Sequence, residues 1–512
     1  MPVWMRGAIG YEVYVRSFMD TDGDGLGDLR GVRQRLDHLV DLGVDVVWLT
    51  PVSPSPDADH GYDVADYMAI DPRFGDLDEF TRLVQDAHDR GLRLIMDLVP
   101  NHTSIQHPWF RDALSGPGST HRDWYVWHEP GPDGAPPNNW VQHLGGPAWT
   151  LDEASRAYYL HLFLPEQPDL NWHNPAVRQE FCRILQFWLD RDVDGFRVDV
   201  AHALTIDPQL RDNPLIGEPP TPDLTPREAF ARYAHLHDLD QGDNLEVFRA
   251  WRDVAQPHDA VLIGEVYLPD AHRWGRYVDG TGLHAAFWFP ALQTGWDAGA
   301  MRRALTEGVS HGGAATCWPL SSHDDPYATT RFGGGELGRQ RGLAWLVLLC
   351  VLPGAVFLHQ GEELGLDNAE FAAGELVDPM AVRNQAGAGR DGTRAPMPWE
   401  PGHQYRFTSG TPWLPHGHNR TDRDTVAVQR KDPASHLHQV RQILHRRRAW
   451  RDLPDEVTWL DAGPDVIALR RGSVIAAMNL GDQAVKLPAG LGGLASTQQV
   501  ERCRTLVVEV DG

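Results

Sequence analysis

The sequence has few cysteines and no apolar segment long enough to cross a membrane. Its four cysteines are dispersed over 512 residues without a C-x-x-C spacing, which excludes a disulfide framework and a thiolate metal site. The most apolar stretch, 342–359, is interrupted by Pro353 and Gly354 and predicts a buried helix followed by a buried strand. Residues 1–18 contain no continuous apolar run and no small-residue cleavage site. Together with the free thiols, this indicates a cytoplasmic protein.

Basic side chains are also scarce. The chain has 46 Lys and Arg against 71 Asp and Glu, a net charge of −25. That excess argues against binding to nucleic acids or anionic membranes, both of which attract basic surfaces. A hydrophobic content of 42% and a charged content of 23% are typical of a folded protein and exclude disorder as the dominant state. We therefore expect a soluble protein with no nucleic-acid or membrane partner; the oligomeric state stays open.

A unit of helix, turn and short apolar strand recurs along most of the chain. In the first copy, apolar residues recur at helical spacing over 29–42, Gly43 is the expected C-cap, and 44–49 (VDVVWL) predicts a buried strand. The other helix and strand pairs are 77–90 with 92–99, 175–190 with 195–200, 245–255 with 260–263, and 337–352 with 355–358, and further strands are expected at 9–15, 285–289 and 316–320. Eight parallel strands predict a closed α/β architecture, the (β/α)8 TIM barrel.

Two regions depart from this pattern. Residues 103–174 form a long stretch rich in Trp, Pro, Gly and His, which predicts an inserted domain. Residues 453–512 show short alternating runs separated by turn residues, which predicts a small antiparallel β domain. The barrel is accordingly assigned to 1–102 and 175–452.

Charged side chains gather where the predicted strands end. The carboxyl ends of barrel strands meet at one rim, where active sites lie. An Asp after a strand is also a common N-cap, and this alternative applies to each acid taken alone. Several acids on one rim repel one another and shift their pKa values apart, which suits glycoside hydrolysis by two carboxyl groups. The residues concerned are Asp97, Arg197, Asp199, Glu265, His323 and Asp324.

Eight motifs occur in a fixed order along the chain. They are GYDVADY (61–67), DLVPNH (97–102), QPDLNW (167–172), GFRVD (195–199), IGEV (263–266), HD (323–324), QGEELG (360–365) and GRDGTRAPMPW (389–399). The ordered set resembles the α-amylase superfamily, glycoside hydrolase family 13, and within it the oligo-1,6-glucosidase and α-glucosidase subgroup. This resemblance spans residues 8–400 or thereabouts. It implies a catalytic barrel, an inserted domain B after the third strand, a C-terminal β-sandwich domain and no organic cofactor.

The resemblance also implies roles for the three acids. Asp199 matches the nucleophile, Glu265 the general acid and base, and Asp324 the residue that stabilises the transition state. Such an enzyme retains the anomeric configuration, with its two catalytic carboxyl groups about 5–5.5 Å apart. Arg197 would pair with Asp199 and keep it ionised at neutral pH.

Further substrate contacts follow from the same resemblance. His102 and His323 would donate to hydroxyls of one sugar ring, although buried histidines are also common structural residues, and Tyr62 would stack on that ring. An ion pair between Asp59 and Arg390 would close the pocket beyond one glucose. Arg394 is a competing candidate for the arginine that pairs with Asp59. Alternatively, the ion pair between Asp59 and Arg390 is an ordinary surface salt bridge without a role in binding.

The residue after the nucleophile bears on linkage preference. In the subgroup that the chain resembles, Val at this position is associated with α-1,6 linkages and Thr or Ala with α-1,4 linkages. The chain has Val200, whereas Ser322 stands where Asn is common. We expect a broad specificity for short oligosaccharides or disaccharides.

An acidic loop near the N-terminus predicts a metal site. The segment DTDGDGLGD (20–28) places carboxylates at alternate positions, as at the start of an EF-hand, but position 31 is Gly where an EF-hand has Glu. The alternative is an acidic Gly-rich turn without metal. The resemblance implies a structural calcium, and the matching ligands are Asp20, Asp22, Asp24, the Leu26 carbonyl and Asp28.

Three functions remain open at this point. The first is a retaining α-glucosidase that hydrolyses terminal α-1,4- or α-1,6-linked glucose through a covalent glycosyl-enzyme. The second is a transferase or isomerase of the same superfamily, of the trehalose synthase or isomaltulose synthase type. The third, a non-catalytic binding protein, is disfavoured because all three acids, Arg197 and both histidines are present.

Overall fold

Eight parallel strands close into a barrel in the computed structural model, which describes residues 1–221, 224–384, 389–494 and 496–510. The strands follow chain order around the barrel, and the last lies beside the first. They are β1 Ile9–Val13, β2 Val46–Leu49, β3 Arg93–Leu98, β7 Gly195–Val198, β8 Val261–Gly264, β9 Ala285–Phe287, β10 Thr316–Pro319 and β11 Ala355–His359. Each overlaps the strand predicted for it, so the predicted TIM barrel is confirmed.

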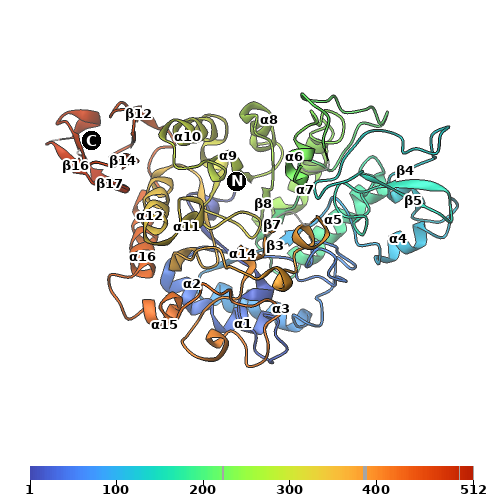
Figure 1. Ribbon diagram of the computed structural model, residues 1–512, viewed down its shortest axis with the longest axis horizontal. Helices are drawn as coiled ribbons and strands as arrows, with labels where there is room; N and C mark the ends of the chain where they lie inside the picture. The colour runs from blue at the N-terminus through green and yellow to red at the C-terminus, as the bar shows by residue number, and fades with distance from the viewer. Residues whose placement is uncertain (222–223, 385–388, 495, 511–512) are drawn as a thin grey trace.

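Helices surround this barrel (Figure 1). The predicted helix 29–42 is divided in two because Arg35 leaves helical geometry, with φ −105° and ψ 4°. As predicted, Gly43 ends the second half in the left-handed region at φ 97°. No helix among the described residues has the length and apolar character needed to cross a membrane.

The helices that follow barrel strands have these bounds. Those of twelve residues or more are α3 Leu77–Asp89, α5 Pro175–Leu189, α7 Asn244–Ala255, α10 Ala298–Gly312, α12 Gly335–Val351 and α16 His436–Arg447. The shorter ones are α1 Leu29–Gln34, α2 Leu36–Leu42, α6 Pro226–Phe230, α8 Ala271–Gly275, α9 Phe289–Leu292, α11 Ala328–Arg331, α13 Pro379–Asn384, α14 Asp391–Arg394 and α15 Val426–Gln429.

Side chains alternate between the barrel interior and the surrounding helices. In β2, Val46 and Trp48 belong to the interior cluster, whereas Val47 and Leu49 pack in the cluster formed with the helices. Successive side chains of a strand point to opposite faces, so residues two positions apart point to the same face. Ile95 and Ile263 lie in the interior cluster, and two residues further along stand Asp97 and Glu265. The alternation therefore directs these acids to the mouth of the barrel.

The segment between β3 and α5 forms a small antiparallel sheet in the order β4-β6-β5. An isolated bridge between His102 and Asp169 ties its two ends together next to the barrel. Its elements are α4 Pro108–Ala113, β4 Trp127–His128, β5 Trp149–Asp152 and β6 Ala157–Leu160. This is the predicted insertion after the third barrel strand.

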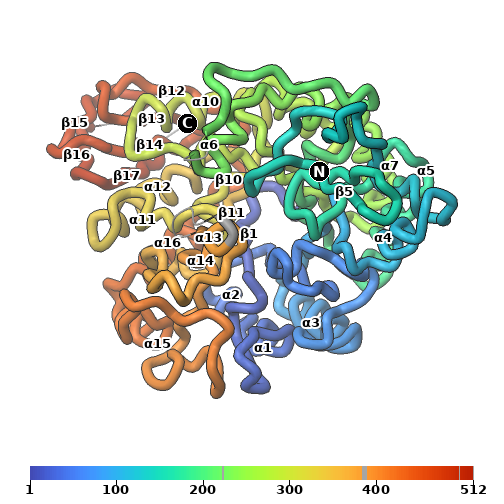
Figure 2. Tube along the Cα trace, turned by 45° about the vertical axis from the view of Figure 1, so that its right-hand side comes forward, coloured from blue at the N-terminus to red at the C-terminus, as the bar shows by residue number. Residues whose placement is uncertain are grey.

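Two antiparallel sheets complete the chain at its C-terminal end. Arg471 donates to the carbonyls of Val351 (3.0 Å) and Leu352 (2.9 Å) and so fixes the larger sheet to the end of α12. The sheets consist of β12 Thr458–Leu460, β13 Val466–Arg471, β14 Val474–Asn479 and β17 Arg504–Glu509, and of β15 Val485–Leu487 with β16 Gln498–Val500. Figures 1 and 2 show them at the opposite end of the molecule from β5. The predicted boundaries at 102, 174 and 452 all fall between elements.

Candidate active site

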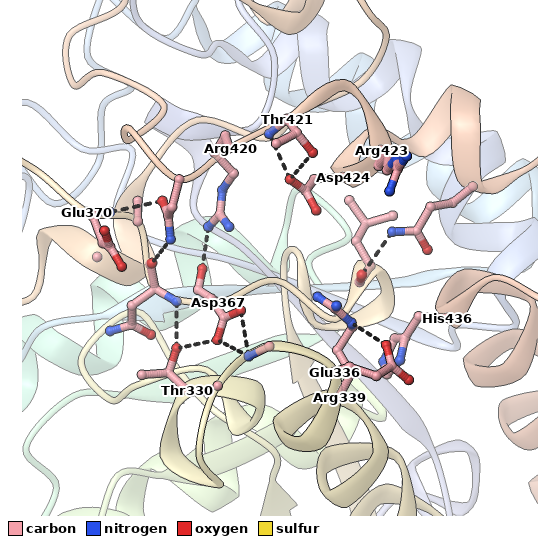
Figure 3. A pocket seen from close by; sticks show the side chains of 18 of the residues that line it. Thr330, Glu336, Arg339, Asp367, Glu370, Arg420, Thr421, Arg423, Asp424 and His436 are labelled. Atoms are coloured by element: carbon pink, nitrogen blue, oxygen red, sulfur yellow. Dashed lines mark hydrogen bonds and ion pairs between the residues drawn. The ribbon is translucent and has the colours of Figure 1, made fainter.

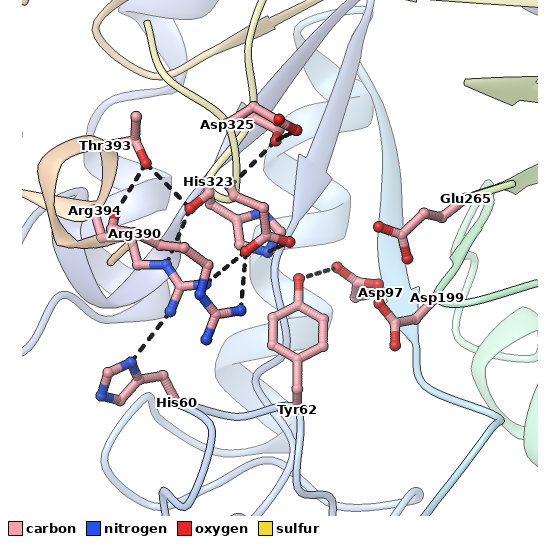
Figure 4. A network of polar contacts seen from close by, with 12 residues as sticks. His60, Tyr62, Asp97, Asp199, Glu265, His323, Asp325, Arg390, Thr393 and Arg394 are labelled. Carbon is pink, nitrogen blue, oxygen red and sulfur yellow. Dashed lines mark hydrogen bonds and ion pairs between the residues drawn. The ribbon is translucent and has the colours of Figure 1, made fainter. Parts of the chain in front are cut away.

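One arginine connects the acids at the mouth of the barrel. Arg197 Nη1 lies 2.5 Å from Asp199 Oδ1 and 2.8 Å from Asp97 Oδ1, and Arg197 Nη2 lies 2.8 Å from Glu265 Oε1. β7 presents Arg197 and is followed directly by Asp199, while Glu265 follows neighbouring β8. Figure 4 shows Asp97, Asp199 and Glu265 grouped beside Tyr62. The structure thus brings together acids that are 66 residues apart or more.

A single guanidinium cannot balance three buried carboxylates. Burial raises the pKa of Asp199 well above its usual value, Arg197 opposes this effect, and Glu265 and Asp97 reinforce it. Burial likewise raises the pKa of Asp97, to about 6, against the opposing charge of Arg197. Arg197 pairs with Asp199 as expected, but its charge opposes only part of the effect of burial on the pKa of Asp199. That Asp199 is ionised at neutral pH stays a prediction. Burial and the neighbouring acids therefore favour the protonated form of Asp199, whose side chain lies within hydrogen-bonding reach of Glu265.

Asp324 lies in the same pocket as Arg197 and Glu265 but has different partners. Its Oδ1 is 2.7 Å from Arg394 Nη2 and 3.2 Å from Arg390 Nη1. Burial raises the pKa of Asp324, but His323, Arg390 and Arg394 outweigh it and hold that pKa far below its usual value. Asp324 is therefore the permanently ionised acid of the site.

The predicted ion pair between Asp59 and Arg390 is present. Arg390 Nη2 lies 2.7 Å from Asp59 Oδ1, and the Asp59 side chain is 6% exposed. Burial excludes the alternative of an ordinary surface salt bridge. The competing candidate, Arg394, binds Asp324 and the His323 carbonyl (3.0 Å) instead. Arg390 also binds Asp378, which the sequence reasoning missed because no strand end or motif marks it.

His323 is held between two tyrosine rings. It stacks on Tyr62 at 5.3 Å between ring centroids and on Tyr14 at 5.7 Å. Its Nδ1 lies 2.5 Å from Glu12 Oε1, and its Nε2 lies 3.2 Å from Asp324 Oδ2. The Tyr62 hydroxyl donates to Asp97 (3.0 Å), which fixes the ring beside the acids. Glu12 was also missed, although an acid inside the buried strand β1 was a detectable signal.

His102 has protein partners at both ring nitrogens. Its Nε2 is 3.0 Å from the Tyr62 carbonyl and 3.0 Å from Gln167 Nε2, and its Nδ1 is 3.3 Å from Asn101 Nδ2. Burial lowers the pKa of His102 to about 4, so the ring is neutral near pH 7. Donation to a sugar hydroxyl stays a prediction for this residue, since it requires the exchange of a protein partner.

Val200 has an unusual backbone conformation directly after Asp199. Its φ is 43°, in the left-handed region that β-branched residues rarely adopt. Its N–H donates to Glu265 Oε2 at 2.8 Å, and its side chain packs with residues of the inserted segment, among them Trp140 and Leu162. Val200, which is predicted to affect linkage preference, thus also contacts Glu265.

The comparison with known proteins agrees with this geometry. A family model described as the alpha-amylase catalytic domain matches residues 12–455. The chain belongs to the α-amylase family of glycoside hydrolases. A probable alpha-glucosidase from Rhizobium meliloti (strain 1021) is 41% identical over 460 residues, which are 87% of this chain and 83% of that protein. An oligo-1,6-glucosidase from Parageobacillus thermoglucosidasius is 35% identical over 483 residues, 87% of this chain and 84% of that protein.

A solved structure is similar over nearly the full length. The crystal structure of an alpha-glucosyl transfer enzyme, XgtA, superposes with a TM-score of 0.92 at 37% identity, covering 99% of both chains. The predicted membership of glycoside hydrolase family 13 is confirmed, and with it the assignment of this chain as an enzyme that acts on glycosidic bonds.

In this family member, the acidic loop near the N-terminus brings three carboxylates together. Oxygens of Asp20, Asp22 and Asp28 all lie within 4.8 Å of one another. Asp24 is not part of this group, and its Oδ1 accepts the N–H of Leu26 at 2.8 Å. Burial raises the pKa of Asp28, with Asp20 adding to the effect. A hard divalent cation with oxygen ligands fits these three acids.

A larger cleft, of about 1490 Å³, is lined by residues such as Thr330, Asp367 and Arg420 (Figure 3). Gly389 and Gly392 form part of its wall, but Asp199, Glu265 and Asp324 do not line it. Its charged groups, such as Asp367 and Arg420, largely bind one another and the loops around them (Figure 3). The chemistry of this enzyme is therefore assigned to the smaller pocket at the mouth of the barrel.

Proposed function

We propose that this chain is a retaining α-glucosidase that removes terminal α-linked glucose, 1,4- or 1,6-linked, from short oligosaccharides through a covalent glycosyl-enzyme. The observation that carries this proposal is the contact of one guanidinium, Arg197, with both Asp199 (2.5 Å) and Glu265 (2.8 Å). An inverting glycosidase needs its carboxyl groups about 6.5–9.5 Å apart to admit a water, whereas these two lie close enough to share a proton.

In the first step, Glu265 carries the shared proton and gives it to the glycosidic oxygen. An Asp199 carboxylate oxygen attacks the anomeric carbon while the bond to the leaving sugar breaks. Arg197 stabilises the Asp199 carboxylate before attack through its 2.5 Å contact. The Val200 N–H, 2.8 Å from Glu265 Oε2, holds the acid in place. Asp324, ionised between two arginines, binds sugar hydroxyls and favours a distorted ring.

In the second step, water enters where the leaving sugar departed. The Glu265 carboxylate takes a proton from that water, the water oxygen bonds to the anomeric carbon, and the bond to Asp199 breaks. Two inversions at one carbon give net retention. The pair of Asp59 and Arg390 closes the far side of the pocket, so glucose leaves one unit at a time from the non-reducing end.

Product analysis tests this proposal. We expect the protein to release glucose from maltose or isomaltose, with the α-anomer first in a proton NMR time course. Asp199→Ala keeps the fold and lowers kcat on the order of 10⁴-fold or more, because a covalent step is removed. A β-anomer as first product, or a fully active Asp199→Ala variant, contradicts the proposal.

Glucosyl transfer is the second candidate, favoured by the near-complete superposition on the alpha-glucosyl transfer enzyme XgtA. Hydrolysis and transfer share the covalent intermediate and differ in whether water or a second sugar reaches it. Incubation with maltose, isomaltose, sucrose and trehalose at low and high concentration distinguishes them. Disaccharide isomers or longer products that dominate even at low substrate concentration identify a transferase or isomerase.

We also propose that the N-terminal loop binds a structural calcium through Asp20, Asp22 and Asp28, supported by the convergence of their carboxylates. The contributions predicted for Asp24 and for the Leu26 carbonyl stay predictions, since Asp24 lies outside the convergent group. The ion has no part in the reaction steps. A cytoplasmic location is proposed on the four cysteines, all of which are free thiols.

A further inference from the structure

Arg390 makes more contacts with Asp378 than with Asp59. Its Nη2 is 2.8 Å and its Nε 3.2 Å from Asp378 Oδ1, and its backbone N–H donates to Asp378 Oδ2 at 2.6 Å. Asp59 and Asp324 each receive a single contact, at 2.7 and 3.2 Å. Asp378 therefore fixes both the main chain and the guanidinium of Arg390.

Asp378 is itself held rigidly and away from solvent. Its side chain is fully buried. Asp391, the residue after Arg390, accepts the N–H groups of Val377 (2.8 Å) and Asp378 (3.1 Å) on one carboxylate oxygen. Burial raises the pKa of Asp378, but Arg390 and Arg394 outweigh it and hold that pKa far below its usual value. The carboxylate is therefore ionised across the pH range in which a protein is normally assayed.

We propose that Asp378 is a positioning residue that fixes Arg390 across the far wall of the glucose pocket and thereby restricts the enzyme to chain ends. This inference rests on the proposed α-glucosidase function. It goes beyond the pair of Asp59 and Arg390, because Asp378 is fully buried and does not line the pocket that contains Arg197, Glu265 and Asp324.

The charges show why an anchor is needed. Arg390 faces the ionised Asp324, which the proposed mechanism requires for the sugar hydroxyls. A free guanidinium moves toward the nearest carboxylates and, without Asp378, Arg390 gains freedom to form a closer pair with Asp324. That movement occupies an Asp324 oxygen that the proposed mechanism needs for sugar hydroxyls, and it opens the far wall. With Asp378 bound to Nε and Nη2, only Nη1 reaches Asp324, at 3.2 Å.

Asp378→Asn tests this role, because it keeps the shape and removes the charge and one acceptor. With p-nitrophenyl α-glucoside we expect KM to rise about tenfold or more, with a smaller change in kcat, as for a lost charged contact that positions substrate. We also expect release of products from a maltohexaoside blocked at its non-reducing end, which the wild type does not cleave. Asp378→Glu restores part of the loss.

A double-mutant cycle shows whether Asp378 acts through Arg390. In an Arg390→Ala background, Asp378→Asn adds less than about twofold to KM, because the residue through which it acts is gone. A full additional effect in that background overturns the inference. If Asp378→Asn alone folds poorly, the same cycle is run with Asp378→Glu, whose remaining loss should likewise shrink in the Arg390→Ala background.

The matched control is Asp194→Asn. Asp194 is also buried and paired with an arginine (Arg93, 2.7 Å), but it precedes β7 at the opposite end of the barrel from Asp199. We expect its KM to stay at the wild-type value. If Asp378→Asn folds, has the wild-type KM and does not cleave the blocked substrate, the inference is overturned while the proposed function stands. A wild type that hydrolyses no α-glucoside overturns the proposed function, and the inference with it.

Discussion

The backbone N–H of Val200 donates to the Glu265 carboxylate at 2.8 Å, so the residue that follows Asp199 also holds its partner acid. Val200 adopts φ 43°, which costs a β-branched residue on the order of 1–3 kcal/mol. Its side chain packs into the apolar cluster of the inserted segment. This one residue therefore connects the inserted segment to both carboxyl groups proposed to carry the reaction.

Replacement of this side chain should change linkage preference. Val200→Thr keeps the branched shape but places a hydroxyl against an apolar cluster, which costs about 1–3 kcal/mol when the hydroxyl lacks a partner. We expect the ratio of kcat/KM for maltose to that for isomaltose to rise. Val198→Thr, a similar change on the outer side of β7, is the control and leaves the ratio unchanged. An unchanged ratio in Val200→Thr removes Val200 from linkage selection.

Much of the fold and the core of the site follow from sequence. All eight barrel strands overlap their predicted positions, because buried strands between amphipathic helices leave few alternatives. Since polar groups at strand ends must meet at the rim, the association of Asp199 with Glu265 was predictable too. The pair of Asp59 and Arg390 came from resemblance alone, since neither residue ends a strand.

Other features depend on tertiary packing that a sequence does not display. Asp378 stands at the start of a short helix in a segment without periodicity, so nothing marks it as the anchor of Arg390. The positive φ of Val200 is a property of the backbone directly after β7, and the sequence does not indicate it, because Val rarely adopts this conformation. The protein partners of His102 also depend on Gln167, which is 65 residues distant.

Asp97 should make stability depend on pH. Its pKa in the folded protein is about 6, because burial raises it and Arg197 offsets only part of the effect, against about 3.9 in an unfolded chain. A raised carboxyl pKa contributes stability that is full below about pH 4 and is lost as the pH rises through 6, in total about 3 kcal/mol. Asp97→Asn mimics the protonated form at every pH and lacks this loss.

Urea unfolding of both proteins at about pH 4 and pH 7 measures the effect. We expect the stability of the wild type relative to Asp97→Asn to fall by up to about 3 kcal/mol between the two pH values. A difference that does not change with pH contradicts the raised pKa. Asp194→Asn provides the control for general loss of a buried carboxylate paired with arginine.

Glu12 should have the opposite dependence. Burial raises its pKa, but His359 and His323 outweigh burial and lower that pKa to about 2. A depressed carboxyl pKa contributes stability that is present above about pH 4.3 and is lost as the pH falls through 2. Glu12→Gln therefore costs about 3 kcal/mol near pH 6, and the cost shrinks toward about pH 3.

Activity separates this effect from simple destabilisation. Glu12 fixes His323 Nδ1 at 2.5 Å, which directs Nε2 toward Asp324. Glu12→Gln at a temperature well below its melting point should still lower kcat/KM about tenfold or more, because it weakens the orienting contact of His323, which is proposed to bind the sugar. Wild-type kcat/KM in the folded variant limits Glu12 to a structural role.

Chelation should destabilise the protein through the N-terminal loop. A ligand bound only by the folded state raises the melting temperature, so EDTA is expected to lower it by about 5 °C and added calcium to restore it.

Asp22 and Asp24 form a matched pair, because both are exposed and each accepts the N–H two residues ahead, at 3.1 and 2.8 Å. Only Asp22 belongs to the convergent group of carboxylates. Asp22→Asn should therefore abolish the response to EDTA, whereas Asp24→Asn should keep most of it. If both variants lose the response to EDTA, Asp24 is also a ligand. If neither EDTA nor calcium changes the melting temperature of the wild type, the proposed metal site is contradicted.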